Sequence, residues 1–449
     1  MRILVSFLGR ARQPNQAEGY RWAKYRLENQ GCRPASASDG MEKPRNRAGS
    51  HAAAQQPLSA GSEDIFETQY FGLGLARRLQ VDRLLLLGTA SSMWDVLLEQ
   101  QLVRPEAVKI AGLSEDDRLA LIEACQAGAV TRPLLEQFRP ALEALTGQRL
   151  TLELIPMALD SESQARILSR LAELLQPGDE VVFDITHGLR HLAMLALVAA
   201  ILLERLRRIR VADIYYGALE ARAEDGVAPV VNLSGMLDLL RWIQAFSAYD
   251  AGGNYSVFQP LFHHPVPPPA KLPRLSQAAF EQSCFSVSQA RKHLLPYLTL
   301  LQASANPPLK LFAPELAARL AWIRQQHRDE WELAVGDAAL DRGDYLRAAA
   351  HYQEAFISRR LRHRPHAQRR DAREEAEESL ARQFEAYRNL RNLRNLLVHG
   401  DRSKNWQGRK EILDLLTDEV RMCQAISGWR NELERKIQPG ELAAAGALD

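Results

Sequence analysis

Near the C-terminal end, the stretch RNLRNLRNLLVHGDR (388–402) repeats Arg-Asn-Leu three times before a single histidine. A histidine with an ordinary pKa of about 6.5 can transfer protons near neutral pH. An arginine can hold a phosphate through two parallel hydrogen bonds. His399 and one of these arginines could therefore combine proton transfer with the binding of a phosphate. No cluster of Asp or Glu accompanies the motif, which argues against a two-metal nuclease.

The three arginines of this stretch are not equivalent on a straight helix. At about 100° per residue, one face carries Asn392, Asn395 and His399, and the opposite face carries Leu390, Leu393 and Leu397. Arg391 then lies roughly 80° from His399 and Arg394 roughly 140° away. Helix geometry favours Arg391 or Arg388 as the partner of His399, unless two chains build the site together. The alternative is a solvated arginine face, with Gly400 ending the helix and His399 interacting only with its dipole.

The elements that precede this helix fall into two classes, and the first is a mixture of strands and helices. Five apolar runs are strand candidates: ILVSFLG (3–9), RLLLLGT (83–89), LTLELIPM (150–157), EVVFDIT (180–186) and VADIYYG (211–217). Helix-length segments separate several of them, such as 92–102 and 161–176. This alternation predicts a parallel sheet covered by helices on both faces.

An insertion follows the first strand. Residues 20–28 and 64–69 are expected to form a hairpin arm. The stretch 31–62 between them is rich in Ser, Ala, Gly and Pro and offers little to bury. We expect it to be a disordered loop.

Polar side chains and glycines follow three of the predicted strands. They are Gly9 and Arg10 after the first, Gly88, Thr89, Ser91 and Ser92 after the second, and Thr186, His187, Gly188 and Arg190 after the fourth. Ligands of open α/β sheets bind beyond the carboxyl ends of the strands, where helix N-termini also favour anions. The turns therefore predict a site for a phosphate-bearing ligand, although tight turns without a ligand would use the same residues. The dinucleotide motif GxGxxG is missing.

In this order, SFLG, Tyr20 and Tyr25 of the arm, LGTASSMWD and DITHGLR resemble the CARF sensor domains of type III CRISPR systems. The resemblance implies a Rossmann-like α/β domain over residues 1–245. It also implies that these turns bind a cyclic oligoadenylate at the two-fold axis of a homodimer. Tetra-adenylate is favoured over hexa-adenylate.

The second class of elements is entirely helical. The run QPLFHHPVPPPAKLP (259–273) contains six prolines, so residues 246–275 are expected to be a proline-rich linker. Beyond it, apolar residues recur at three- and four-residue spacing in the segments 276–303, 313–341, 344–362, 371–398 and 409–436. An all-α domain is expected over residues 276–449. The basic run 358–373 could follow an RNA backbone or be a solvated helix end.

Within this helical half, Arg394-x4-His399 resembles the motif of HEPN ribonucleases, which lies at a dimer interface. The resemblance implies that Arg394, Asn395 and His399 are catalytic and that no metal is needed. Arg388 and Arg391 are then expected to bind RNA. CARF and HEPN domains are a known pairing, so the resemblance extends over almost the whole chain.

Together these features predict a single-stranded RNA endoribonuclease of CRISPR antiviral defence that a cyclic oligoadenylate activates, with no cofactor for catalysis. An alternative is a ligand-sensing regulator whose helical domain binds RNA or a partner without cleavage. The first domain could also degrade its own activator.

The cysteine spacing, the hydropathy and the net charge argue against several other classes of protein. Cys32, Cys125, Cys284 and Cys423 lie far apart without a CxxC pair, which argues against a zinc site or a disulfide framework and fits a reducing cytoplasm. The N-terminus begins with a strand-like run, so no signal peptide is expected. No apolar stretch is long enough to span a membrane. The net charge of +2 does not identify a partner, and neither membrane nor DNA binding is expected.

Overall fold

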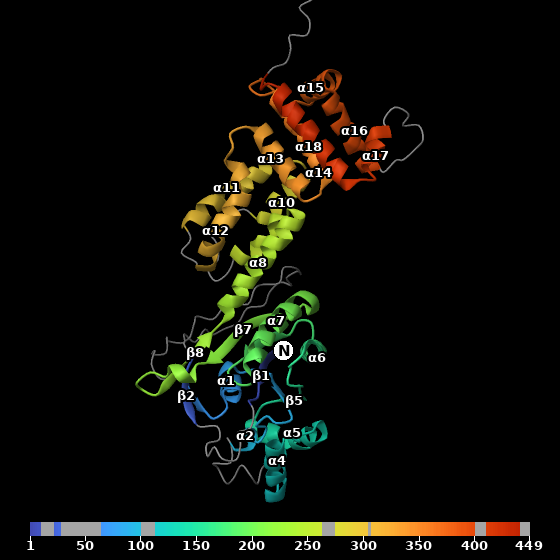
Figure 1. Cartoon of the computed structure of the whole chain (residues 1–449). Coiled ribbons are helices and arrows are strands. Elements are labelled where there is room, and N and C mark those ends of the chain that lie inside the picture. Colours follow the sequence, from blue (N-terminus) through green and yellow to red (C-terminus); the bar gives the residue numbers. More distant parts are fainter. Residues whose placement is uncertain are drawn as a thin grey trace, which may run out of the picture. The chain divides into compact units, whose positions relative to one another are not determined.

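The computed structural model describes residues 1–9, 22–27, 64–99, 113–262, 274–303, 307–399 and 410–440. The chain forms two compact units, residues 1–237 and 238–449. The first is a sheet with helices, and the second consists of helices in the residues described (Figure 1). An α/β domain followed by an all-α region, as the sequence predicts, is confirmed.

The first unit is built on an eight-stranded sheet with the strand order β3-β2-β8-β7-β6-β1-β4-β5. The strands are β1 (Arg2–Phe7), β2 (Ala23–Arg26), β3 (Ile65–Thr68), β4 (Arg83–Gly88), β5 (Leu150–Leu154), β6 (Glu180–Asp184), β7 (Arg210–Gly217) and β8 (Val227–Asn232). The five predicted strands form a continuous parallel block, β7-β6-β1-β4-β5, and β2 also runs parallel to β8. Strand β8, which runs antiparallel to β7, was not predicted.

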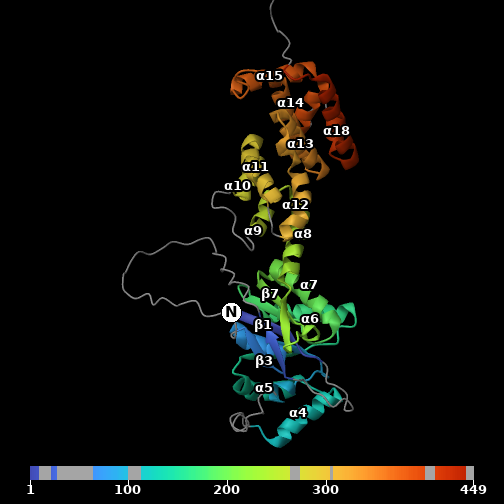
Figure 2. The same ribbon diagram turned by 90° about the vertical axis from the view of Figure 1, so that its left-hand side faces the viewer.

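Helices cover both faces of this sheet (Figure 2). They are α1 (Phe71–Leu79), α2 (Val96–Glu99), α4 (Glu115–Ala127), α5 (Arg132–Thr146), α6 (Ser161–Leu174) and α7 (Arg190–Arg207). Alternate residues of β1 enter different cores, because side chains of a strand point to opposite faces in turn. Leu4 packs in a core with α1, α4 and α5, whereas Val5 packs in a second core with α6 and α7.

The predicted hairpin arm is the antiparallel pair β2 and β3, which extends the sheet beyond β8. Tyr25 of β2 stacks on Phe66 of β3, with ring centroids 5.7 Å apart, and meets Phe71 edge-on at 4.8 Å. The amide of Leu27 donates to the carbonyl of Asp64 at 2.9 Å, which closes the arm. The loop predicted at 31–62 lies outside the described residues.

The remaining helices, with short 3₁₀ turns η2 and η3, make up the second unit apart from the first turn of α8. They are α8 (Ser234–Gly252), η2 (Tyr255–Phe258), α9 (Gln259–Phe262), α10 (Leu275–Ser283), α11 (Val287–Ala303), α12 (Pro307–Arg319), η3 (Ala321–Arg324), α13 (Arg328–Asp341), α14 (Tyr345–Arg360), α15 (Arg370–Gln383), α16 (Glu385–His399), α17 (Lys410–Leu415) and α18 (Glu419–Lys436). One core joins α8–α13 and another joins α13–α18.

The structure differs from the predicted linker at 246–275. Helix α8 continues to Gly252, so the predicted domain end at residue 245 lies inside a helix. Phe246, Tyr249 and Phe258 are buried around Trp242. Residues 246–262 therefore belong to the core of the second unit because their aromatic side chains have a place to pack. Residues 263–273 are outside the described part.

Most of the predicted long helical segments are divided in two. The segment 371–398, for example, is α15 and α16, separated by Phe384 in an extended conformation (φ −122°, ψ 117°). The break lets α16 change direction and pack on α14 and α18. Its residues thus follow a helix that begins at Glu385 and ends at His399.

Candidate functional site

The carboxyl ends of β6, β1 and β4 are neighbours at one edge of the sheet. These strands are parallel, and their register pairs Ser6 with Asp184 and Phe7 with Leu87. The turns that follow them begin at Leu8, Thr89 and Ile185. The three turns selected from the sequence therefore meet above one edge, as open α/β sheets arrange their ligand sites.

The turn after β4 is held by its own hydroxyls. The amide of Thr89 donates to Ser92 Oγ at 2.8 Å, and Ser92 Oγ donates to the carbonyl of Leu8 at 3.3 Å. Trp94 Nε1 donates to the Thr89 carbonyl at 3.0 Å. Ser92 is buried and serves the turn itself, whereas Thr89 and Ser91 are half-buried, 3.2 Å apart between their hydroxyls.

Gly88 is required by the indole packed against this turn. A Cβ at Gly88 would lie 2.6 Å from Cζ2 of Trp94, closer than side-chain atoms approach. The absence of a side chain lets the β4 end and the Trp94 ring pack in contact. Gly88 therefore shapes the site.

The turn after β6 is anchored by a buried carboxylate. Asp184 accepts from Ser6 Oγ at 2.5 Å and from the amide of Thr186 at 2.8 Å, and burial raises the pKa of Asp184 to about 6. Thr186 Oγ1 in turn accepts from the amide of Gly217 at 2.8 Å. Gly188 follows with φ +95°, a conformation that favours glycine. The hydroxyl of Thr186 thus fixes the turn to the end of β7.

His187 is directed at helix α1. Its ring stacks on Tyr70 with centroids 5.4 Å apart, and its Nε2 accepts from the amide of Phe71 at 3.5 Å. Burial lowers the pKa of His187 to about 4, so the imidazole is neutral at physiological pH. His187 therefore offers no positive charge to a phosphate, and it orients the start of α1.

Arg190 is the residue of these turns best placed to meet an anion. It is exposed at the first position of α7, and in the described part of the chain its side chain has no hydrogen bond or ion pair. The N-terminus of this 18-residue helix adds a favourable partial charge. Gly9 is half-buried, with its carbonyl accepting from Met93 at 3.0 Å, and Arg10 lies outside the described residues.

A hollow beside these turns is lined by Leu8, Gly88, Thr89, Ser91 and Leu189, among others. Its volume of about 10 Å³ is far below that of a nucleotide. One chain alone therefore offers the turns as a surface and does not enclose a ligand there.

Sequence reasoning missed Tyr70, which lies beneath the turns. This fully buried tyrosine places its hydroxyl 2.5 Å from Ser6 Oγ and 3.4 Å from the carbonyl of Phe7. Asp184, Ser6 and Tyr70 thus form a buried polar chain that supports two of the turns. Ser6 in an otherwise apolar strand was the available signal, because a buried hydroxyl needs a partner.

Comparison with known proteins identifies the kind of domain that the first unit forms. Residues 3–220 match the family model described as the CARF domain of the CRISPR system endoribonuclease Csx1. The chain contains a CARF domain. The matched range includes all three turns, from β1 to the end of β7, and it ends before α8. The resemblance of this part of the sequence to CARF domains is thereby confirmed.

A curated relative supports the same assignment. CRISPR-associated protein MJ1674 of Methanocaldococcus jannaschii is 25% identical over 301 residues, which are 64% of this chain and 47% of that protein. The chain thus spans about half the length of this relative. Both comparisons are thus with proteins of CRISPR systems.

Helix α16, outside the CARF match, carries the second candidate site. Leu390, Leu393 and Leu396 are buried in the core as a stripe, and Leu397 is half-buried. Asn392 is also buried, so the predicted polar face is only partly a surface. Asn395 is half-buried and His399 is exposed at the last position of the helix. The open part of the motif is therefore its C-terminal turn.

Arg394 is held by a neighbouring helix. Its Nε and Nη2 donate to Oε1 of Gln353 on α14 at 3.3 and 3.1 Å, and Gln353 is buried. No bond between Arg394 and His399 is present in the single chain's described residues. Gln353 fixes the direction of the guanidinium, which leaves Nη1 for another partner.

The other two arginines of the repeat differ from Arg394. Arg388 Nη1 donates to the carbonyls of Ala381 and Arg382 at 2.8 and 3.1 Å, so it caps the end of α15. Arg391 is half-buried, and within the described ranges it makes no hydrogen bond or ion pair. The three repeats thus place their arginines in three environments.

The basic run 358–373 bonds largely to other side chains of the second unit. Arg360 donates to Gln383 at 2.9 Å, Arg362 Nε donates to Asp329 at 3.0 Å, and Arg373 pairs with Glu354. These contacts favour a structural role for the three arginines. Arg364 and Arg369 remain exposed.

The described residues contain neither a membrane-spanning helix nor a cluster of metal-binding side chains. No helix there is long and apolar enough to cross a membrane. No three His, Cys, Asp or Glu side chains in that part of the chain gather in an arrangement that could hold a metal ion.

Proposed function

We propose that the protein is a metal-independent endoribonuclease for single-stranded RNA, activated by a cyclic oligoadenylate in CRISPR antiviral defence in the cytoplasm. The observation that carries the proposal is the pairing of a CARF domain with a helical unit in which Arg394-x4-His399 lies on α16. Arg394 is oriented by Gln353 and His399 is open to solvent.

The activator would bind at the three strand-end turns. Arg190 and the N-terminus of α7 would contact a phosphate, and Thr89 and Ser91 would donate hydroxyl hydrogen bonds. Gly9, Arg10 and Gly188 would line the same surface. Ser92, Thr186, His187 and Gly88 would act indirectly, by holding the turns in shape. Tetra-adenylate remains the favoured ring.

In the ribonuclease site, His399 would move the proton of the 2′-hydroxyl or of the leaving 5′-oxygen. Arg394 would stabilise the charge that develops on the phosphate oxygens. Asn395, one turn before His399, would orient the imidazole or a phosphate oxygen. Arg388 and Arg391 would add attraction for the RNA backbone.

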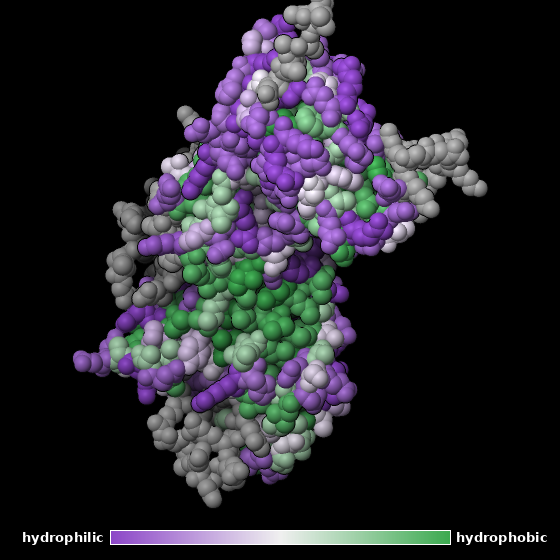
Figure 3. All heavy atoms as spheres, turned by 45° about the horizontal axis from the view of Figure 1, so that its top comes forward, coloured by the Kyte–Doolittle hydropathy of each residue, from purple (hydrophilic) through white to green (hydrophobic). Residues whose placement is uncertain are grey.

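Assembly as a homodimer would complete both sites, and an apolar patch supports it. Met194, Val198 and Leu206 lie on one face of α7 at four- and eight-residue spacing and are 73%, 51% and 75% exposed. Figure 3 shows a broad hydrophobic area on this side of the molecule, and Met157 and Leu159 are also exposed. Exposed apolar patches of this kind are typical of interaction surfaces, which supports a dimer contact here. Two chains that pack through this patch about a two-fold axis would place two α7 N-terminal turns in one dimer.

Met194→Asp should weaken this dimer at least tenfold, because the carboxylate would be buried at the contact without a partner. Size-exclusion chromatography with light scattering over a concentration series would measure the change. Leu119→Asp on α4 is the matched control, since Leu119 is exposed outside the patch. A Met194→Asp protein that stays as dimeric as this control would contradict the assignment of the patch.

A second candidate is a ligand-sensing regulator that binds RNA or a partner without cleavage. The observation in its favour is the bond between Arg394 and Gln353, which a purely structural arginine would also make. On this view His399 is an exposed helix end. A CARF domain that binds an activator is compatible with both candidate functions.

Labelled single-stranded RNA incubated in EDTA separates the two. With cyclic tetra-adenylate present, we expect cleavage that is at least tenfold faster than without it, and cyclic hexa-adenylate should be weaker. Cleavage that disappears in EDTA would contradict the metal-independent mechanism. RNA binding without any cutting, with either ring, would favour the regulator.

A further inference from the structure

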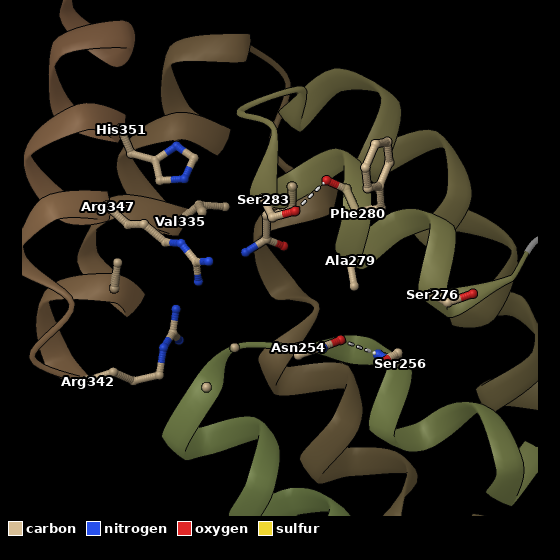
Figure 4. A pocket seen from close by; sticks show the side chains of 14 residues that line it. Asn254, Ser256, Ser276, Ala279, Phe280, Ser283, Val335, Arg342, Arg347 and His351 are labelled. Atoms are coloured by element: carbon tan, nitrogen blue, oxygen red, sulfur yellow. Dashed lines mark hydrogen bonds between the residues drawn. The ribbon is translucent and has the colours of Figure 1, made fainter. Parts of the chain in front are cut away.

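The second unit contains a pocket that neither candidate site uses. It has a volume of about 340 Å³ and lies between the end of α8 with α10 on one side and α13 with α14 on the other. Figure 4 shows Arg342, Arg347 and His351 on one wall, with Ser283 and Asn254 across from them. Its size falls within the range of small-molecule sites, about 300–1,000 Å³.

The charge of this pocket is positive. Two arginines line it, and none of the lining residues is Asp or Glu. The side chain of Arg342 makes no hydrogen bond or ion pair with the described residues, and Arg347 makes one ion pair, at 3.4 Å to Asp344. The nearby carboxylate of Asp250 is already bound by Arg319, at 2.6 and 2.7 Å. The two guanidinium groups thus keep donors for an anion.

Glycine at position 253 lets Arg342 reach the pocket. Gly253 adopts φ +68°, and a Cβ there would lie 2.7 Å from Nη2 of Arg342. On the opposite side of the α13–α14 turn, Asp344 caps α14 by accepting from the amide of Arg347 at 3.2 Å. Arg347 therefore lies in the first turn of a 16-residue helix, whose N-terminus also favours anions.

Buried polar atoms at the pocket lack partners. His351 is only 2% exposed, and its Nδ1 has no hydrogen-bond partner. Oε1 of Gln282, on the facing helix, is also buried without one. Burial and the charges of Arg347 and Arg342 lower the pKa of His351 to about 4. A neutral imidazole has one N–H donor and one acceptor. Buried polar groups are normally satisfied, so these atoms indicate a ligand that completes them.

We propose that this pocket binds the phosphate group of a small phosphorylated ligand of nucleotide size. Arg342 and Arg347 hold the phosphate, and the imidazole of His351 donates to it or to the adjoining sugar. Phe280, which lines the pocket and is 60% exposed, offers its ring to a base. Oε1 of Gln282 accepts a hydrogen bond from a hydroxyl or amino group of the ligand.

The position of the pocket gives it a connection to the ribonuclease helix. His351 and Gln353 are two residues apart on α14, and Gln353 holds Arg394. A ligand that fixes α14 at His351 therefore acts on the same helix that orients Arg394. Binding at the pocket does not depend on whether α16 cleaves RNA, so it is tested separately from the proposed function.

Titration calorimetry of the full chain with AMP and with inorganic phosphate tests the proposal. We expect both to bind, AMP at least tenfold more tightly because of the base. Arg342→Gln and Arg347→Gln should each weaken AMP binding at least tenfold, and His351→Phe should weaken it while keeping the ring volume. Arg324→Gln, an exposed arginine of the same unit outside the pocket, is the matched control and should bind normally.

Two further measurements separate the pocket from the CARF turns. Arg190→Ala should retain AMP binding, and hydrogen exchange should slow in peptides covering 276–283 and 342–351 when AMP is added. No binding, or binding that survives both arginine substitutions, would overturn the site. Equal affinities for AMP and phosphate would overturn the contact between Phe280 and a base.

Discussion

His399→Ala should lower the rate of activator-stimulated RNA cleavage by at least a hundredfold, in the range expected when general acid–base catalysis is lost. The substitution should leave folding intact, because His399 is exposed at the end of α16. Single-turnover cleavage at saturating activator measures the effect. Thermal unfolding of the variant is the control for its fold. Near-normal cleavage by a folded His399→Ala protein would remove α16 from the chemistry.

Arg394→Ala should cost a comparable factor in the same assay, and Asn395→Ala less. Removing Arg394 also leaves the buried oxygen of Gln353 unpaired, which should lower the free energy of unfolding by about 1–3 kcal/mol. Gln353→Ala separates the two effects, since it releases the guanidinium and keeps its charge. We expect Gln353→Ala to reduce the cleavage rate by less than Arg394→Ala does.

Arg391→Ala is the matched comparison within the repeat. It should act mainly on RNA affinity, with a loss that grows smaller as salt is raised. A dead Arg391→Ala protein beside an active Arg394→Ala protein would show that the helical wheel identifies the partner of His399 better than the family motif.

Arg190→Ala should weaken activator binding by roughly 30- to 150-fold, the equivalent of about 2–3 kcal/mol for a charge-assisted phosphate contact. The side chain is exposed and has no partner among the described residues, so its removal should not disturb the fold. Titration calorimetry with cyclic tetra-adenylate measures the affinity. Arg166→Ala on α6, also an exposed arginine of the CARF domain, should bind normally. Undiminished affinity of Arg190→Ala would remove the activator from this turn.

The central strands could be predicted because their residues are almost continuously apolar. The strands β1, β4 and β6 are buried between two helical layers, and a parallel sheet of that kind needs such runs. Strand β8 was missed, since its sequence VAPVVN is short and contains Pro229, which argues against a strand inside a sheet. Pro229 fits because its carbonyl still accepts from Ala218.

The linker prediction went too far because it relied on composition. The prolines at 260–273 led to the prediction of a linker, but the aromatic side chains before them recur at helical spacing in Trp242, Phe246 and Tyr249. That spacing indicates a helix with a buried face. Periodicity was therefore the better guide to where the second unit begins.

For the candidate sites, the sequence predicted which turns meet but not which residues hold them. Parallel strands bring their carboxyl ends to one edge, so the three turns could be grouped in advance. The bond between Arg394 and Gln353 and the contact between Tyr70 and Ser6 join residues distant in the chain. A periodic pattern in the sequence does not reveal contacts between distant residues. It also did not reveal that Asn392 is buried.

The closure of the β2–β3 arm has a consequence for protein engineering. The bond from Leu27 to Asp64 fixes the two ends of the intervening segment, and Arg26 pairs with Ile65 in the register of the hairpin. The free-energy cost of closing a loop grows only with the logarithm of its length. The chain between these two residues can therefore be exchanged for a short turn, or for a reporter protein with adjacent termini, at little cost to the sheet.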